Sequence, residues 1–190
     1  MHSIRIGSRI LCLCVMTAVL ILLAGPARAQ LEAGAQALQE DRLEAAVEAF
    51  ERAAQDGDAR AMFNLGLMAE QGLLREEPDY LSASSWYRAA ASKGDPRAQY
   101  NLGLLHMEGK GFAQNYRTAS EWFHKAAEGG SARAMHNLAI MYYEGLGRVR
   151  LNYAKSRQWF DRAARHGFVK GRNDLDHVGL THTRAGFYLE

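Results

Sequence analysis

The sequence contains very little cysteine, and the positions of its cysteines exclude two kinds of chemistry. Only two are present among 190 residues, Cys12 and Cys14, and both lie in an apolar run near the start of the chain. From Gln30 onward there is no thiol, so that part has neither a disulfide framework nor a cysteine nucleophile. We expect it to be held together by packing alone.

The sequence also lacks the short motifs of several enzyme classes. It has no Ser-x-x-Lys, which penicillin-recognising enzymes use to place an amine beside the nucleophile, and no His-Glu-x-x-His or Cys/His cluster for zinc. No phosphate-binding glycine loop follows a strand, because no strands are predicted. Six of the seven histidines lie after the predicted signal and are scattered at no ligand spacing: His106, His124, His136, His166, His177 and His182. We therefore expect no catalytic residues, no metal and no cofactor.

The charges are nearly balanced in number but unevenly distributed. The 23 Lys and Arg against 21 Asp and Glu are typical neither of a disordered polyelectrolyte nor of a nucleic-acid binder. Residues 30–57 hold two cations and seven anions, whereas residues 131–190 hold ten cations and five anions. This gradient could steer partners by sign or favour weak head-to-tail self-association. The alternative is that the end charges only keep the two ends soluble.

The first 29 residues have the pattern of a secretory signal peptide. Arg5 and Arg9 precede the apolar run 10–23, and Ala27-Arg28-Ala29 provides an Ala-x-Ala cleavage site. The run is shorter than the roughly 20 residues that span a bilayer, so an uncleaved anchor is the weaker alternative. We expect cleavage after Ala29, a periplasmic or secreted protein, and membrane contact only through the cleaved signal.

Three segments of the chain repeat with a period of 36 to 37 residues. The triplet Asn-Leu-Gly, or Asn-Leu-Ala in the third case, begins at residues 64, 101 and 137. A tryptophan followed by Tyr or Phe recurs at residues 86, 122 and 159, and each pair is followed by two alanines and a glycine. A fixed period of this length is typical of stacked repeats. The predicted units are 58–94, 95–130 and 131–167.

Within each unit the capping residues predict two helices. The first helix is expected to begin after Asp58, Asp95 or Ser131 and to stop at Gly72, Gly109 or Gly145. The second is expected to begin after Asp79, Asn115 or Asn152 and to stop at Gly94, Gly130 or Gly167. Such hairpins cannot bury their apolar faces alone. The predicted fold class is therefore all-α, a right-handed α-solenoid of antiparallel helix pairs.

The flanking segments fit the same plan. Residues 30–57 predict an N-terminal tetratricopeptide-like helix pair, with a short first helix from about Leu31 to Gln39. Leu43, Ala46 and Phe50 then match the second-helix pattern one period upstream. Residues 168–190 predict a more polar C-terminal capping helix and tail.

These motifs resemble the Sel-1-like repeat, a longer-looped relative of the tetratricopeptide repeat. The resemblance rests on Ala-x-x-x-Leu-Gly, on Glu-Gly-x-Gly as at residues 108–111 and 144–147, and on Ala-x-x-Trp-Phe-x-x-Ala-Ala-x-x-Gly. Leu74, Ala139 and Ser156 depart from the pattern, and Leu74 puts the shape of its loop in question.

The resemblance implies a non-enzymatic adaptor or regulator that binds other proteins, with secreted bacterial members acting in the cell envelope. Some relatives are linked to penicillin binding or β-lactamase activity, so a cell-wall or β-lactam hydrolase is one alternative. A peptidoglycan or glycan binder is another, although the three tryptophans are expected on the packing face. The missing nucleophile motifs disfavour the hydrolase.

Three arginines recur at one position of the repeat, in the first turn of the first helix, where a cation opposes the helix dipole by roughly 0.3 to 1 kcal/mol. In tetratricopeptide-like folds the first helices line the concave face. Arginine can fork onto a carboxylate and asparagine can pair with a peptide backbone, which predicts a groove for an extended or acidic protein segment. The predicted partner-binding residues are Arg60, Phe63, Asn64, Arg97, Tyr100, Asn101, Arg133, His136 and Asn137.

A purely structural interpretation of these nine residues, called the predicted row below, stays open. The asparagines could simply hold the hairpin, and each arginine could simply form an ion pair with the capping aspartate two residues earlier. If the arginines do bind a partner, replacing all three by Gln is expected to leave thermal stability unchanged or slightly higher while abolishing partner binding.

Overall fold

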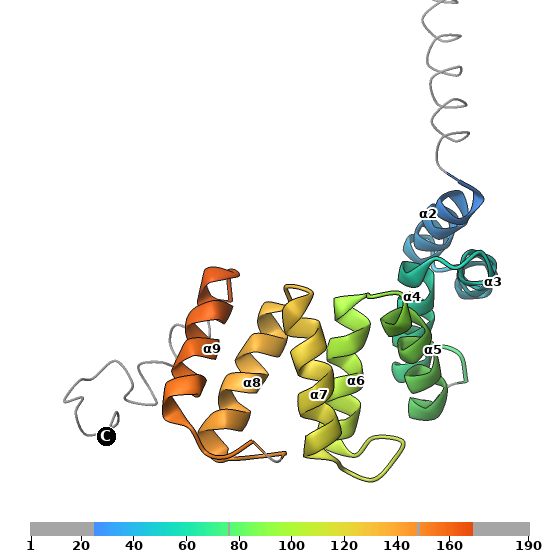
Figure 1. Ribbon diagram of the computed structural model, residues 1–190. Helices are drawn as coiled ribbons and strands as arrows, with labels where there is room; N and C mark the ends of the chain where they lie inside the picture. The colour runs from blue at the N-terminus through green and yellow to red at the C-terminus, as the bar shows by residue number, and fades with distance from the viewer. Residues whose placement is uncertain (1–24, 76, 148, 169–190) are drawn as a thin grey trace, which may run out of the picture. The chain divides into compact units, whose positions relative to one another are not determined.

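A computed structural model describes residues 25–75, 77–147 and 149–168, which contain eight helices and no strand (Figure 1). The chain divides into two compact units, residues 1–65 and 66–190, and each is described by itself. The helices are α2 (Pro26–Gln39), α3 (Leu43–Gln55), α4 (Ala59–Glu70), α5 (Tyr80–Ser92), α6 (Pro96–Glu108), α7 (Tyr116–Glu128), α8 (Ala132–Glu144) and α9 (Tyr153–Arg165). Most of the predicted signal and the C-terminal segment after Phe168 lie outside the described residues.

In the first unit, α2 and α3 form a helix pair. Gly34 of α2 lies against the ring of Phe50, so that a Cβ built on this glycine would be 2.6 Å from the ring. Phe50 and Ala46 of α3 are fully buried, as the pattern predicted. Helix α2 begins at Pro26 rather than near Leu31. Proline is favoured at the first helical position because its ring fixes φ close to the helical value.

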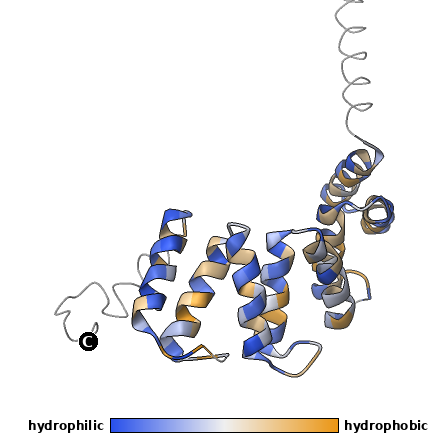
Figure 2. Cartoon of the chain, viewed as in Figure 1, coloured by the Kyte–Doolittle hydropathy of each residue, from blue (hydrophilic) through white to orange (hydrophobic). Residues whose placement is uncertain are grey.

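In the second unit, α5 to α9 pack in chain order, each helix against the next. Hydrophobic and hydrophilic residues alternate around α6 to α9 in Figure 2, as expected for helices with one buried side. A cluster of buried side chains that includes Phe123, Leu138 and Met141 forms the core of this stack.

The predicted capping residues begin the helices. The side chains of Asp79, Asn115 and Asn152 accept hydrogen bonds from the third backbone N–H that follows, at 2.9, 3.1 and 2.9 Å. Asp95 and Ser131 cap α6 and α8 in the same way. Gly109 and Gly145 end these two helices with a φ of 73° and 71°, a left-handed conformation that glycine adopts without strain.

A small residue in each first helix accommodates an aromatic ring of the second. A Cβ on Gly66 would lie 2.5 Å from the ring of Tyr87, and one on Gly103 would lie 2.4 Å from the ring of Phe123. In the third repeat Ala139 takes this position and packs with Phe160 in a small buried cluster. The glycine of Asn-Leu-Gly therefore makes room for the ring, which sets the distance between the paired helices.

The second glycine of each Gly-x-Gly loop contacts the preceding repeat. A Cβ on Gly111 would lie 3.0 Å from the Cβ of Tyr80, and one on Gly147 would lie 2.3 Å from the carbonyl oxygen of Tyr116. Tyr80 and Tyr116 are the first residues of α5 and α7. These loops therefore hold successive hairpins together, in addition to joining the two helices of one hairpin.

Candidate functional site

Two of the three recurring arginines bind the capping aspartate of their own helix. Arg60 donates from Nε and Nη2 to Asp58 at 3.2 and 2.8 Å. Arg97 does the same to Asp95 at 3.1 and 2.6 Å. The aspartate side chains are 9% and 6% exposed, whereas the arginine side chains are 52% and 51% exposed. For these two residues the structural interpretation of the row fits the geometry.

Arg133 has a different environment. The residue two positions earlier is Ser131, which has no carboxylate, and Arg133 is exposed and forms no ion pair with any residue that the structure describes. Its charge acts instead on the Tyr100 phenol. Among the three arginines it is therefore the best placed to bind a carboxylate from a partner.

The asparagines of the second and third repeats hydrogen-bond to tyrosines of neighbouring helices. Burial raises the pKa of Tyr100, and the charge of Arg133 and a hydrogen bond from Asn137 oppose that rise. Burial and the adjacent carboxylate of Glu70 raise the pKa of Tyr87, whose hydroxyl is 2.5 Å from Glu70 and also receives a hydrogen bond from Asn101. The asparagine side chains thus link α6 to α5 and α8 to α6, that is, one repeat to the preceding one, rather than the two helices of a single hairpin.

The remaining predicted site residues lie in two places. His136 is buried, at 6% exposed, and its ring centroid lies 5.4 Å from that of Phe160 and 4.7 Å from that of Phe168. It therefore does not belong to the exposed part of the row. Phe63 and Asn64 are half-buried and belong, with Arg60, to the first unit.

The Asp95–Arg97 pair predicts how stability depends on pH. Burial raises the pKa of Asp95, but hydrogen bonds from the Arg97 side chain and from backbone N–H groups, with the Arg97 charge, outweigh burial and leave the pKa below its ordinary value. The ionised carboxylate thus stabilises the fold above the unfolded-state pKa, and this contribution disappears as the pH falls through the lower folded-state pKa.

We expect the Asp95→Asn variant, which keeps a capping oxygen, to be less stable than wild type at neutral pH. The gap in unfolding free energy should narrow as the pH falls below about 4, because protonation removes the same ion pair in wild type. Urea unfolding of both proteins from pH 7 to pH 3 measures the gap. A difference in unfolding free energy that stays constant over this pH range would contradict a stabilising Asp95–Arg97 ion pair.

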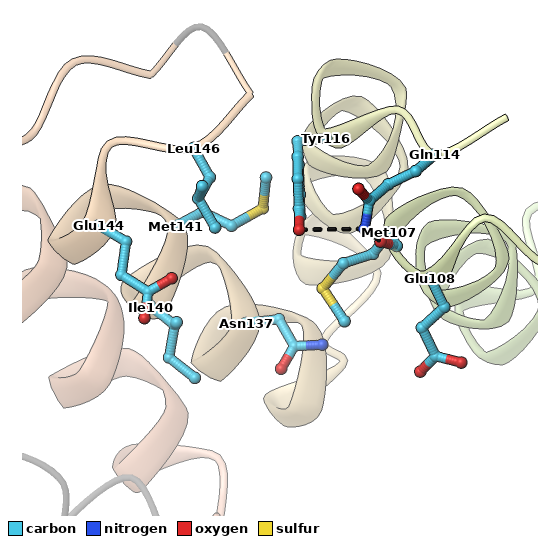
Figure 3. Close-up of a pocket in the computed structure, with 9 residues that line it drawn as sticks. All are labelled: Met107, Glu108, Gln114, Tyr116, Asn137, Ile140, Met141, Glu144 and Leu146. Atoms are coloured by element: carbon cyan, nitrogen blue, oxygen red, sulfur yellow. Dashed lines mark hydrogen bonds between the residues drawn. The ribbon is translucent and has the colours of Figure 1, made fainter.

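A cavity that the sequence did not predict lies between α6 and α8 (Figure 3). Its volume is about 470 Å³, within the range of small-ligand pockets. It is lined by Met107, Glu108, Gln114, Tyr116, Asn137, Ile140, Met141, Glu144 and Leu146. Asn137 is the residue that the cavity shares with the predicted row. The glutamate of each Glu-Gly-x-Gly motif was the one sequence feature that could have pointed to the cavity. The residues opposite it belong to another repeat, so the motif alone did not predict the cavity.

The described parts of the chain contain neither a membrane-spanning helix nor a metal-binding cluster. No helix there is long and apolar enough to cross a membrane. Those residues also hold no group of three or more His, Cys, Asp or Glu side chains arranged to bind a metal ion. The pKa of His106 and that of His124 are lowered, chiefly by burial, and both rings pack on aromatic neighbours.

Two of the solved structures that resemble this chain share 30% identity or more with it. One is c5321, described as a protective antigen present in uropathogenic Escherichia coli strains and displaying an SLR fold, with 36% identity and a TM-score of 0.75. The other is a Sel1 repeat protein from Oxalobacter formigenes, with 30% identity and a TM-score of 0.72. The matches cover 84% and 78% of this chain, but only 34% and 60% of those two proteins.

A third structure supports the fold alone. It is cysteine rich protein B of Helicobacter pylori, with 18% identity, a TM-score of 0.54, and coverage of 68% of this chain and 96% of that one. A search of curated proteins gave no significant match.

Protein-family models identify the three repeats directly. The Sel1 repeat matches residues 59–95, 96–131 and 132–168, which together make up more than half of the chain. Each matched segment begins one residue after the corresponding unit predicted from the sequence. With its all-α repeat fold and the two similar structures, the chain belongs to the Sel1 repeat family.

Proposed function

We propose that this protein is a non-enzymatic adaptor of the bacterial cell envelope that binds a segment of a partner protein along the α6–α8 seam. The α6–α8 seam is defined here as Arg97, Tyr100, Asn101, Arg133, Asn137 and the cavity beside them. Sel1 repeats are typically scaffolds for protein interactions. The observation that carries the proposal is the continuity of this surface, because Asn137 both hydrogen-bonds to Tyr100 and lines the cavity.

The seam offers the groups that an extended segment needs. The guanidinium group of Arg133 can bind a carboxylate through two N–H groups. No ion pair with a described residue has to be broken for this. Tyr100 is half-buried and supplies apolar area together with a hydroxyl group. Peptide recognition of this kind combines a few such anchors with main-chain hydrogen bonds.

Export is the second part of the proposal, and the signal pattern supports it. The predicted cleavage point after Ala29 falls inside α2, but the buried residues of that helix, Gly34 and Ala37, come after it. Processing there leaves the packed part of α2 on the mature chain. Mass spectrometry of the protein from cell fractions tests this, with an N-terminus at Gln30 expected in the envelope fraction. An intact N-terminus in the cytosol contradicts it.

Arg133→Gln tests the binding face. We expect a several-fold loss of partner in co-purification with no loss of stability, because a cation in the first helical turn opposes the dipole and Arg133 has no ion pair with a described residue. Replacing Arg60 or Arg97 by Gln is instead expected to lower stability, because either change breaks an ion pair with a capping aspartate. The expectation of unchanged stability is thus restricted to Arg133.

The matched control is Arg88→Gln, which changes an exposed arginine on α5. It should leave partner recovery at the wild-type level. Equal recovery with Arg133→Gln and wild type, both folded by circular dichroism, contradicts the proposed binding face.

A further inference from the structure

The cavity of the α6–α8 seam has apolar walls. Met107 of α6 and Ile140 and Met141 of α8 form two sides, and Tyr116 at the start of α7 and Leu146 of the following loop complete the lining (Figure 3). Met141 is buried, whereas the other four are half-buried and leave apolar surface facing the opening. A partner side chain with a long apolar portion can bury that surface.

Two glutamate side chains lie at the opening of the cavity. Glu108 and Glu144, which line it from opposite helices, are exposed and are the last residues of α6 and α8. Both helices therefore also direct the negative ends of their dipoles towards this region. Glu108 forms a 2.8 Å ion pair with Lys110, while Glu144 forms no ion pair with any described residue.

We propose that the cavity binds an arginine or lysine side chain of the partner segment. The aliphatic stem of that side chain lies on Met107, Ile140 and Leu146, and its cation lies between Glu108 and Glu144. An uncharged apolar side chain would cover the walls but would desolvate the Glu144 carboxylate, which has no ion-pair partner among the described residues, and an acidic side chain would be repelled. This inference rests on the proposed function and names the chemistry of the segment that the seam recognises.

The other end of the seam sets the spacing of charges in the partner. Arg97 and Arg133 each lie eleven residues before the glutamate of the same helix, which corresponds to about 16 Å along the helix axis. An extended chain covers that distance in about five residues, at roughly 3.3 Å per residue. The recognised segment therefore carries a carboxylate about five positions from its arginine or lysine.

Selection from a random twelve-residue peptide library displayed on phage, against the purified full chain, tests the proposal. We expect enrichment of peptides with an Asp or Glu about five positions from an Arg or Lys. Synthetic copies of the enriched peptides should bind the Glu108→Gln/Glu144→Gln variant about tenfold more weakly, because the side chains keep their shape and lose their charge. Glu144→Lys should shift the enriched residue at the cavity position from basic to acidic.

The matched control is Glu128→Gln. Glu128 is also an exposed glutamate at the last position of a helix, but it belongs to α7 and does not line the cavity. Its affinity for the synthetic peptides should equal that of wild type, and circular dichroism melts should show that all variants remain folded.

The outcomes separate this inference from the function on which it rests. If enriched peptides lose affinity on Arg133→Gln but bind the double glutamine variant as tightly as wild type, the seam binds peptides and the basic-residue site is wrong. If the full chain enriches no peptide above an unrelated protein, both proposals fail.

Discussion

Replacing Phe123 by alanine is expected to lower the free energy of unfolding by about 3 to 5 kcal/mol, the usual cost of truncating a fully buried phenylalanine. Phe123 is 0% exposed and lies over Gly103 of the paired helix. The centroids of the Phe123 and Tyr100 rings are 5.8 Å apart. Because Gly103 has no side chain that could move into the space, the cavity left by the substitution should stay largely open.

The control for this prediction is Leu81→Ala, which removes a large apolar side chain from a residue that is 62% exposed. It should change stability by no more than about 0.5 kcal/mol. Urea unfolding followed by circular dichroism measures both variants. A loss below about 1 kcal/mol for Phe123→Ala would mean that the ring is not the centre of the α6–α7 pair.

Gly147→Ala is expected to cost about 3 kcal/mol or more, because two effects add. The φ of Gly147 is 70°, a region that L-residues occupy at a cost of roughly 1 to 2 kcal/mol. In addition, the new Cβ would lie 2.3 Å from the carbonyl oxygen of Tyr116, which belongs to the backbone and cannot turn away. Relief of this overlap requires the loop to separate from α7.

Gly130→Ala separates the two effects. Gly130 has a φ of 88°, but a Cβ there would meet nothing within 4 Å. We expect it to cost only the conformational part, about 1 to 2 kcal/mol. Thermal unfolding of both variants measures the difference. Equal losses would contradict the role of the Gly-x-Gly loop in holding successive repeats together.

The sequence alone predicted the helices of the repeats well, because their signals are local. A capping residue such as Asn115 and a left-handed glycine such as Gly109 act within one turn of the helix that they bound. The start of α2 was predicted too late, because residues 27–30, which follow Pro26, carry no repeat signal.

The candidate site was less predictable, because it depends on contacts between repeats. One part of it is local and readable from the sequence: Arg97 pairs with Asp95, whereas Ser131 offers Arg133 no carboxylate. His136 is buried against Phe160 of the paired helix α9 and against Phe168 just after that helix, so no pattern within α8 alone predicts its burial. The cavity is formed by α6 and α8, which belong to different repeats. The residue pattern within one repeat does not show which residues of the next repeat lie opposite it.

Site-specific photo-crosslinking in cells that produce the full chain tests whether the α6–α8 seam binds a partner segment. A photoreactive residue at Ile140, in the cavity wall, is compared with one at Leu81, an exposed position that does not line the cavity. We expect adducts from position 140 only, and mass spectrometry should map them to a partner segment with an Arg or Lys about five positions from a carboxylate. Equal adducts from both positions, or none from position 140, would contradict binding at the seam.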